Sequence, residues 1–402
     1  MGTAATVLLV LVWLLALGWL YQAAIALRGM PTLPDLTRQQ FSAPPTDGEG
    51  PQLTVVVPAC NEEETIRECL RSLLGSAGVR LEILAVNDRS TDQTGALMHQ
   101  VAAEAAATRH TLRVLEIAEL PAGWLGKPHA MAKAAAEARA EWLLFTDGDV
   151  IFAPEALALA LRHAVAEQAG HLVVVPTLVV RSWREQAQQA AMQVLAQWSI
   201  RLWKVADAKA RDFIGVGGFN LVRREAYESV GGFESLRLEV LDDMRMGWKL
   251  KRAGYRSCVA LGPELVRIRW IVGARSVIQL IEKNGFAAFR FQPILHVLAC
   301  LAVALQALVP LAALAAGFCP VAHAGWIAAG GAATYLGIAL TYWASRRLTL
   351  APAWVAALWS PCMLLLVYAL ARSMTLALWR GGVEWRGTRY PLAELKRQSG
   401  RW

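Results

Sequence analysis

The chain has 402 residues, of which 55% are hydrophobic, and it carries a formal net charge of +8. So apolar a composition excludes an ordinary soluble enzyme, and the excess of apolar residues lies at the two ends of the chain. The positive charge would suit a nucleic-acid-binding protein, but basic segments beside membrane spans explain it better, since they face anionic lipid. The six scattered cysteines form no C-x-x-C pair, so neither disulfides nor zinc need be invoked.

An uncharged apolar stretch near the N-terminus, AATVLLVLVWLLALGWLYQAAIAL, is long enough to cross a bilayer core about 30 Å thick. A cleaved signal peptide fits less well, because no basic residue precedes the stretch and the stretch is too long. We therefore expect a retained anchor over residues 1–28 and a linker over residues 29–50. Arg28 and Arg38 follow the apolar stretch, and the positive-inside rule places that side in the cytoplasm.

Residues 51–262 have the composition of a soluble domain and alternate between strand and helix patterns. Short β-branched or apolar runs, with helical patterns between them, predict strands at 53–57, 81–86, 112–117 and 141–145. This alternation predicts an α/β domain with a mostly parallel sheet and helices on both faces. Ligands of such sheets bind at the carboxyl ends of the strands.

Acidic and small polar residues follow three of these strands, in the segments PACNEE, NDRSTDQT and TDGDV. Taken alone, Asp147 and Asp149 would be interpreted as a turn, because Asp and Gly are common turn formers. Parallel strands would bring all three segments to the same edge of the sheet. The pattern therefore indicates one polar cleft rather than a row of independent turns.

Five motifs in order resemble the family 2 glycosyltransferases with the GT-A fold: VVVPACNEEETI, VNDRSTDQT, TDGDV, GVGGFNLVRREAYESVGGF and LEVLDDMRMGWKLKRAGYR. A narrower resemblance rests on LPAGWLGKPHAMAKA, on the Asp-Asp pair and on VEWRGTRYPL. These segments look like the membrane-bound, lipid-directed members, which include ceramide glucosyltransferases, hopanoid-associated glycosyltransferases and carotenoid glycosyltransferases.

The resemblance implies a nucleotide-sugar donor, and it makes Asp88 the residue that reads the uracil of a UDP-sugar. It also makes TDGDV a D-x-D metal motif, in which Asp149 binds Mg²⁺ or Mn²⁺ and Asp147 supports the metal or the ribose. Lys127 opens a helix, where phosphate is favoured; a solvated lysine is the alternative. The candidate nucleotide-sugar-binding residues are Pro58, Glu62, Asp88, Lys127, Asp147, Gly218 and Asn220. An acid in the first turn of a helix is the alternative interpretation of Glu62.

The resemblance also implies a catalytic base in the Asp-Asp pair. It favours Asp243 as the base, with Asp242 as a cap or an orienting neighbour. The alternative is that both residues only cap the helix that follows, since helix caps favour Asp.

This sequence departs from the family pattern at some positions. Asn87 stands where many members have an aspartate, and Asp242 stands where many have glutamate. The Q-x-x-R-W motif of many lipid-directed and processive members is incomplete, because VRIRW has Val266 in the first position. Arg269 and Trp270 remain, and they are candidate residues for the acceptor or the membrane interface.

The C-terminal third contains three apolar runs, which begin at Pro293, Val321 and Ala351, and each could span a membrane. We expect a membrane-interface segment over residues 263–292, a transmembrane region over 293–379 and a basic tail over 380–402. Three full spans would put the tail outside, whereas its positive charge prefers the cytoplasm. The third run contains Pro361 and could be re-entrant, so a cytoplasmic tail is favoured. A helix from Ser182 is either a core helix or a membrane-interface helix.

These observations together predict a multi-pass protein of the cell (inner) membrane with a cytoplasmic catalytic domain. The predicted activity is that of an inverting glycosyltransferase that moves a sugar from a nucleotide-sugar donor to a membrane lipid, with no nucleic-acid partner. The alternatives are a processive polysaccharide synthase, for which the three apolar runs supply few channel helices, and a non-catalytic sugar-nucleotide-binding protein. A degenerate site would be expected to lack at least one of Asp88, Asp147, Asp149 and Asp243, and all are present.

Overall fold

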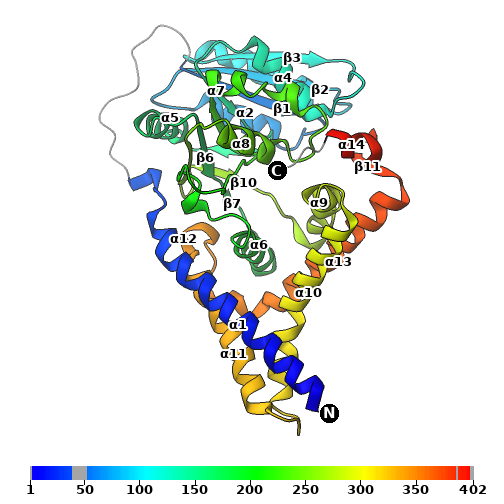
Figure 1. Ribbon diagram of the computed structural model, residues 1–402. Helices are drawn as coiled ribbons and strands as arrows, with labels where there is room; N and C mark the ends of the chain where they lie inside the picture. Colours follow the sequence, from blue (N-terminus) through cyan, green and yellow to red (C-terminus); the bar gives the residue numbers. More distant parts are fainter. Residues whose placement is uncertain (1, 39–51, 386–387, 399–402) are drawn as a thin grey trace. The chain divides into compact units, whose positions relative to one another are not determined.

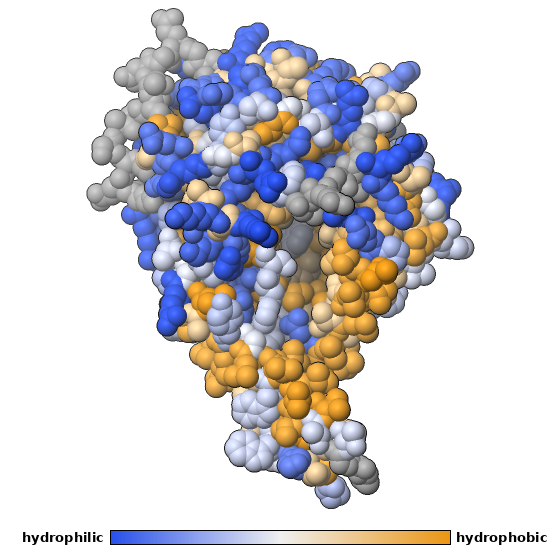
Figure 2. Space-filling model, in the orientation of Figure 1, coloured by the Kyte–Doolittle hydropathy of each residue, from blue (hydrophilic) through white to orange (hydrophobic). Residues whose placement is uncertain are grey.

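The computed structural model describes residues 2–38, 52–385 and 388–398. It contains two compact units, each assembled from separate stretches of the chain (Figure 1). The helical unit comprises Met1–Thr32, Val180–Arg201 and Ile271–Arg397. The sheet unit comprises Leu33–Val179, Leu202–Trp270 and Gln398–Trp402. Hydrophobic residues gather on the surface of the helical unit and hydrophilic residues on that of the sheet unit (Figure 2).

The sheet unit is built on a seven-stranded sheet with the order β3-β2-β1-β4-β8-β6-β9. The strands are β1 (Leu53–Ala59), β2 (Leu81–Asp88), β3 (Thr111–Ile117), β4 (Trp142–Phe145), β6 (His171–Val175), β8 (Asn220–Arg223) and β9 (Ser257–Leu261). All neighbouring pairs are parallel except those of β8, which runs antiparallel to β4 and β6. The predicted mostly parallel sheet is confirmed.

Helices cover both faces of this sheet, as predicted. They are α2 (Ile66–Leu74), α3 (Thr94–Glu104), α4 (Gly126–Glu137), α5 (Ala156–Ala166), α7 (Arg224–Ser229) and α8 (Asp242–Arg252), with short 3₁₀ turns η2 (Leu36–Arg38), η3 (Ala105–Ala107), η4 (Leu202–Lys204) and η5 (Phe233–Leu236). Side chains alternate between two cores: Val55 packs with α2, α3 and α5, whereas Val56 packs with α4 and α8. Burial on both faces explains why the strands are apolar along their whole length.

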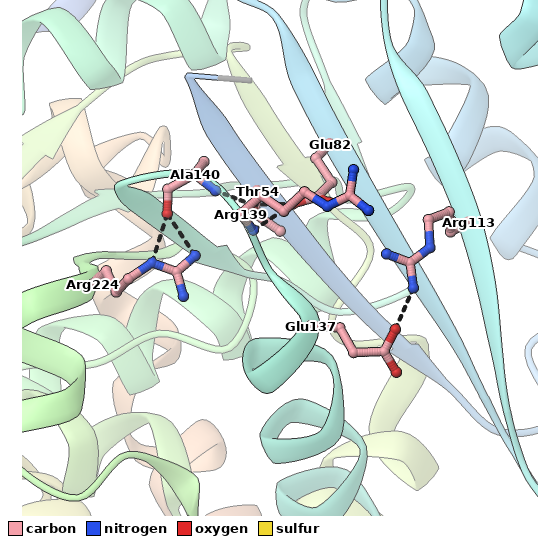
Figure 3. Close-up of polar contacts among 7 residues, drawn as sticks. All are labelled: Thr54, Glu82, Arg113, Glu137, Arg139, Ala140 and Arg224. Atoms are coloured by element: carbon pink, nitrogen blue, oxygen red, sulfur yellow. Dashed lines mark hydrogen bonds and ion pairs between the residues drawn. The ribbon is translucent and has the colours of Figure 1, made fainter. Parts of the chain in front are cut away.

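A buried carboxylate fixes the C-terminal end of α4 to the sheet (Figure 3). Glu82 in β2 is 2% exposed, and its Oε2 accepts hydrogen bonds from Thr54 Oγ1 at 2.7 Å and from the Arg139 backbone N–H at 2.8 Å. Thr54 Oγ1 in turn accepts from the Ala140 N–H at 3.2 Å, and the Arg224 guanidinium donates to the Ala140 carbonyl at 2.7 and 2.9 Å. With its far end held in this way, α4 presents its N-terminal end at a fixed position.

A second, three-stranded sheet has the order β5-β10-β7. It consists of β5 (Val150–Phe152), β10 (Val266–Ile268) and β7 (Thr177–Leu178). Because β5 begins directly after Asp149, the turn between Asp147 and Asp149 joins the two sheets.

Within the described residues, the helical unit contains four helices that are long and apolar enough to cross a membrane: Thr3–Thr32, Pro293–Ala316, Ala324–Ala344 and Ala353–Trp379. Its elements are α1 (Gly2–Gly29), η1 (Met30–Thr32), α6 (Trp183–Ala196), α9 (Gly273–Ala288), α10 (Pro293–Ala316), α11 (Ala324–Ala344), α12 (Arg346–Thr349), η6 (Ala353–Leu358), α13 (Trp359–Trp379), β11 (Gly382–Trp385) and β12 (Thr388–Pro391), and α14 (Leu392–Gln398) follows β12. The helix expected from Ser182 is α6, which packs through Ala187, Ala191 and Val194 into the core of this unit.

Helices α1 and α11 run parallel and in close contact. A Cβ atom on Gly330 would lie 2.7 Å from Val12 Cγ1, and one on Gly337 would lie 2.8 Å from Trp19 Cβ. Small residues spaced along one face allow two apolar helices to approach in this way.

Helix α13 runs antiparallel to α10 and begins beside its middle. Ser360 Oγ at the start of α13 donates to the carbonyl of Ala307, midway along α10, at 2.7 Å. Ten residues later, the Leu370 carbonyl accepts from His296 Nε2, in the first turn of α10, at 2.9 Å. Helix α13 therefore begins beside the middle of α10 and runs toward the end at which α10 begins.

Candidate active site

The loops that follow β1 and β2 are hydrogen-bonded to each other at the carboxyl edge of the sheet. The Asn61 N–H donates to Ser90 Oγ at 3.1 Å, and Asn61 Oδ1 accepts from the Thr91 N–H at 2.8 Å. The Glu62 N–H donates to Thr94 Oγ1 at 2.7 Å. Asn61 has a φ of +56°, a conformation that asparagine tolerates better than most residues. The first two polar segments of the sequence therefore form one wall.

Glu62 lies in the turn between β1 and α2. Helix α2 begins at Ile66 and has Glu68 as the acid of its first turn, so Glu62 is not the first-turn acid of the alternative interpretation. Its Oε2 accepts a hydrogen bond from Thr65 Oγ1 at 3.3 Å, and its charge raises the pKa of Asp149.

Asp88 ends β2 and is 4% exposed. Both of its carboxylate oxygens accept hydrogen bonds from the next residue: Arg89 Nε donates at 2.8 Å and Arg89 Nη2 at 3.1 Å. A φ of +56° at Arg89 allows this contact between neighbours. A Cβ on Gly126 would lie 2.4 Å from Asp88 Oδ2, so only glycine lets the start of α4 approach so closely. Sequence reasoning missed Arg89, whose only signal was its place directly after Asp88.

The turn after β4 carries Asp147 and Asp149 and packs against the end of β1. A Cβ on the intervening Gly148 would lie 3.4 Å from Ala59 Cβ and 3.7 Å from the Pro58 carbonyl oxygen. This places the predicted Pro58 beside the turn.

Asp149 is held in an environment that disfavours its charge. Burial raises the pKa of its carboxyl to about 7, and the charges of Asp147 and Glu62 add to this effect. Its Oδ1 atom is buried and has no hydrogen-bond partner among the described residues. A cation beside this oxygen would relieve both the desolvation and the repulsion.

Lys127 is the second residue of α4, and its Nζ lies 2.5 Å from Asp147 Oδ1. A Cβ on Gly217 would lie 2.7 Å from Asp147 Oδ2 and 3.1 Å from Lys127 Nζ. Burial lowers the pKa of Lys127, but the charges of the neighbouring carboxylates outweigh it and the pKa lies above its ordinary value. The carboxylates that act on Lys127 belong to Asp147, Asp242 and Asp243.

The Asp-Asp pair opens α8. Asp242 is 6% exposed, and Asp243 is half-buried with its Oδ1 accepting the Met244 N–H at 2.7 Å. Burial and the charge of Asp242 raise the pKa of Asp243 to about 6, against the opposing charge of Lys127.

Two glycines let the chain before β8 lie directly on the first turns of α8. A Cβ on Gly215 would lie 1.7 Å from the Asp243 carbonyl oxygen, and one on Gly247 would lie 1.9 Å from the Ile214 carbonyl oxygen. This packing explains why each of the last two motifs has a glycine at this contact, and it fixes α8 beside the ion pair of Lys127 and Asp147.

The remaining predicted residues have distinct positions. Asn220 in β8 is 1% exposed, and its Oδ1 lies 2.5 Å from Nε2 of the buried His171, so its amide takes part in a contact within the sheet. The Gly218 carbonyl accepts from Thr146 Oγ1 at 2.8 Å, which ties the end of β4 to the start of β8. Arg269 and Trp270 follow β10. Ile268 pairs with Val150 in the antiparallel ladder of β10 and β5, so the next residue, Arg269, falls opposite Asp149.

The acidic residues of this site supply only part of the ligands that a metal ion needs. Among the residues that the structure describes, no group of three or more His, Cys, Asp or Glu side chains is placed to hold a metal ion alone. The unpartnered oxygen of Asp149 and the neighbouring Asp147 supply oxygen donors suited to Mg²⁺ or Mn²⁺, which commonly fill their coordination with phosphate oxygens and water. The residues present therefore fit a divalent cation that arrives with a phosphate-bearing ligand.

Comparisons with known proteins agree with this architecture. The family model described as Glycosyl transferase family 2 matches residues 54–231. The 4,4'-diaponeurosporenoate glycosyltransferase of a Staphylococcus aureus strain is 25% identical over 213 residues, which are 52% of this chain and 54% of the relative. The protein of the same name from another strain is 25% identical over 198 residues, which are 48% of this chain and 50% of the relative. The chain thus spans about half the length of the curated relatives it matches.

One solved structure shows the same fold. A mannosyltransferase from Pyrobaculum calidifontis, in complex with GDP-Man and Mn²⁺, superposes with a TM-score of 0.54 and 22% identity. The alignment covers 88% of this chain and 99% of that one. The sheet unit accordingly has the GT-A fold that the sequence predicted.

Proposed function

We propose that the protein transfers a sugar from a nucleotide-sugar donor to a membrane lipid, with inversion at the anomeric carbon, starting from the match of residues 54–231 to the family 2 glycosyltransferase model. The observation that carries the proposal is the meeting of two acidic pairs around Lys127, one from the turn after β4 and one from the start of α8. A sugar transfer needs one charged group for the leaving diphosphate and another for the acceptor proton. These two pairs supply them.

The donor lies, in this proposal, at the carboxyl edge of β1, β2 and β4. The wall made by the loops after β1 and β2 borders the nucleoside, with Pro58, Glu62 and Asp88 on the side of the base and ribose. Because Arg89 already occupies the Asp88 carboxylate, this residue pair would face the base as a unit. We propose uracil as the base. The Pyrobaculum protein was solved with GDP-Man, so guanine is the alternative to test.

Lys127 and the backbone at the start of α4 are placed to bind the diphosphate, because an ammonium and a helix N-terminus both attract phosphate. Asp149, with Asp147, would hold Mg²⁺ or Mn²⁺, which would neutralise the charge that develops on the departing diphosphate. Gly217 and Gly218 leave room for the sugar beside this pair. Asn220 stays a candidate for the donor site, although its Oδ1 already contacts His171.

Asp243 is proposed as the general base. The acceptor oxygen must lose its proton as it attacks the anomeric carbon, and a carboxylate within hydrogen-bond reach can take that proton. A bond forms between the acceptor oxygen and the anomeric carbon as the bond between that carbon and the diphosphate oxygen breaks, and the nucleoside diphosphate leaves. A pKa raised to about 6 by burial and by Asp242 makes Asp243 a stronger base than an exposed aspartate while it stays largely ionised at neutral pH.

A lipid acceptor is supported by the helical unit. Large apolar side chains are exposed along the outer faces of α1 and α10, among them Leu14, Leu17, Leu298 and Leu301. An unpaired apolar surface of this kind suits lipid contact. The curated relatives are named for a carotenoid carboxylate, which is consistent with a hydroxylated or carboxylated lipid as acceptor.

We propose that three helices, α1, α10 and α11, cross the membrane and that α13 is re-entrant. Arg28 lies in the last turn of α1, and Arg346 and Arg347 follow the parallel helix α11, so both helices have basic residues at the same end. The positive-inside rule assigns that end to the cytoplasm. The sheet unit, which follows α1, and the basic tail, which follows α13, are then both cytoplasmic.

The test incubates the purified full-length protein with radiolabelled UDP-sugars or GDP-mannose, a divalent cation and a membrane lipid extract. Labelled lipid is the expected product, and Asp243→Asn is the matched inactive control. Labelled polymer would indicate a polysaccharide synthase instead. Nucleotide binding without any transfer would indicate a non-catalytic binding protein.

A further inference from the structure

Lys127 lies between two acidic pairs that belong to different elements of the sheet unit. Its Nζ is 2.5 Å from Asp147 Oδ1 in the turn after β4, and the Lys127 side chain is only 25% exposed. The charges of Asp242 and Asp243 at the start of α8 also act on it, and its own charge acts on Asp149. The Lys127 ammonium thus makes one ion pair and interacts electrostatically with three further carboxylates.

The contact is partly enclosed, with the Lys127 side chain 25% and the Asp147 side chain 34% exposed. Gly217 approaches so closely that a single added carbon would lie 2.7 Å from Asp147 Oδ2 and 3.1 Å from Lys127 Nζ. The helix that carries Lys127 is fixed at its other end by the buried Glu82. An ion pair held by fixed backbone on both sides is unlike an ordinary surface pair, whose partners separate freely.

We infer that Lys127 is an internal counter-ion whose partner changes on donor binding. Its ammonium neutralises Asp147 in the donor-free protein and pairs with the diphosphate when the sugar nucleotide enters. This inference rests on the proposed function. It assigns Lys127 a positioning role for the acidic site in addition to contact with phosphate.

The exchange has opposite consequences for the two ligands. A divalent cation that approaches Asp147 without nucleotide meets the ammonium and is repelled by it. A diphosphate meets the same ammonium and is attracted. At a separation of about 5 Å in a water-like dielectric, repulsion between an ammonium and a divalent cation corresponds to about tenfold in affinity.

The experiment measures two dissociation constants on the full-length protein in detergent, that of Mn²⁺ without nucleotide and that of UDP or GDP in EDTA. In Lys127→Met, Mn²⁺ should bind about tenfold more tightly than in the wild type, and the nucleotide about tenfold more weakly. A site that was merely damaged would weaken both ligands, so the opposite signs distinguish the counter-ion from a structural role.

Two variants serve as controls. Lys127→Arg keeps the positive charge, so Mn²⁺ should not bind more tightly to it than to the wild type. Lys133→Met removes a half-buried lysine of the same helix, whose Nζ donates to the Glu116 carbonyl at 2.8 Å, and should change neither.

The failures are separable. Weaker binding of both ligands to Lys127→Met, or unchanged binding of both, overturns the inference while the proposed function stands. If the wild type binds neither UDP nor GDP, the proposed function fails and the transfer of Lys127 to a diphosphate fails with it. The Mn²⁺ measurement then still decides whether Lys127 competes for Asp147.

Discussion

Asp243→Asn should inactivate the protein and stabilise it at the same time. The pKa of Asp243 rises from its ordinary 3.8 to about 6 on folding, because burial and the charge of Asp242 disfavour the carboxylate. A rise of about two units corresponds to about 3 kcal/mol at about 1.4 kcal/mol per unit, and partial exposure of the side chain reduces this to about 1–3 kcal/mol. Asparagine has the shape of the protonated acid and its Oδ1 can still accept the Met244 N–H.

The sign of the pH dependence follows from this raised pKa. Between 3.8 and about 6 the folded protein holds a proton on Asp243 that the unfolded chain has lost, so the wild type loses stability as the pH rises through that window and loses no more above it. The gain in stability from Asp243→Asn should therefore be small near pH 3.8 and complete above about pH 6. Transfer should meanwhile fall by roughly 10²–10⁴ because the general base is missing.

Thermal unfolding of the two full-length proteins in detergent, at about pH 5 and about pH 8, measures the stability, and labelled-lipid formation measures the transfer. The paired result is the sensitive one, because a variant that only disturbs packing loses stability and activity together. If Asp243→Asn were less stable than the wild type at the higher pH, this would refute the inference that the Asp243 carboxylate destabilises the folded protein. Near wild-type transfer would refute the base, and an inactive Asp242→Asn beside it would move the role one residue back.

Transfer by the wild type should fall as the pH drops through about 6, because protonated Asp243 cannot accept a proton; a flat rate profile at saturating donor contradicts this. Asp149→Ala should abolish transfer with Mg²⁺ or Mn²⁺, since this residue holds a buried, unpartnered oxygen, whereas full turnover of the wild type in excess EDTA would dismiss the metal. Gly217→Ala should weaken donor binding, because its Cβ would lie 2.7 Å from Asp147 Oδ2. An unchanged dissociation constant would mean that Lys127 and Asp147 move aside without loss of donor binding. Cys319, exposed in the loop after α10, should react with a membrane-impermeant maleimide outside intact cells, and its protection would reverse the proposed topology.

The sequence predicted the first half of the sheet unit closely, because local signals determine it. Strands β1 to β4 lie within two residues of their predicted ends, since each is a short apolar run followed by polar turn residues. The acids at their carboxyl ends were predicted to meet because parallel strands share an edge, and the turn of Asp147 and Asp149 does lie beside Pro58.

Features set by long-range contacts escaped prediction. Nothing local to Asn220 indicates that His171, on a neighbouring strand, will contact its amide. The close approach of Gly215 to Asp243 joins segments 28 residues apart in number, so the motif glycines looked like turn residues. The depth at which α13 begins was also open, because hydropathy measures the length of an apolar run and not where its first turn lies.

The hydrogen bonds between the loops after β1 and β2 have a kinetic consequence. Because the Asn61 amide and side chain are both bonded across the gap, to Ser90 and Thr91, neither loop can open without the other. The two loops therefore form one cooperative unit, with a single opening rate rather than two. Deuterium uptake at the amides of Asn61 and Thr91 would then rise in step, and a nucleotide that enters or leaves past this wall would do so at the frequency of that one event.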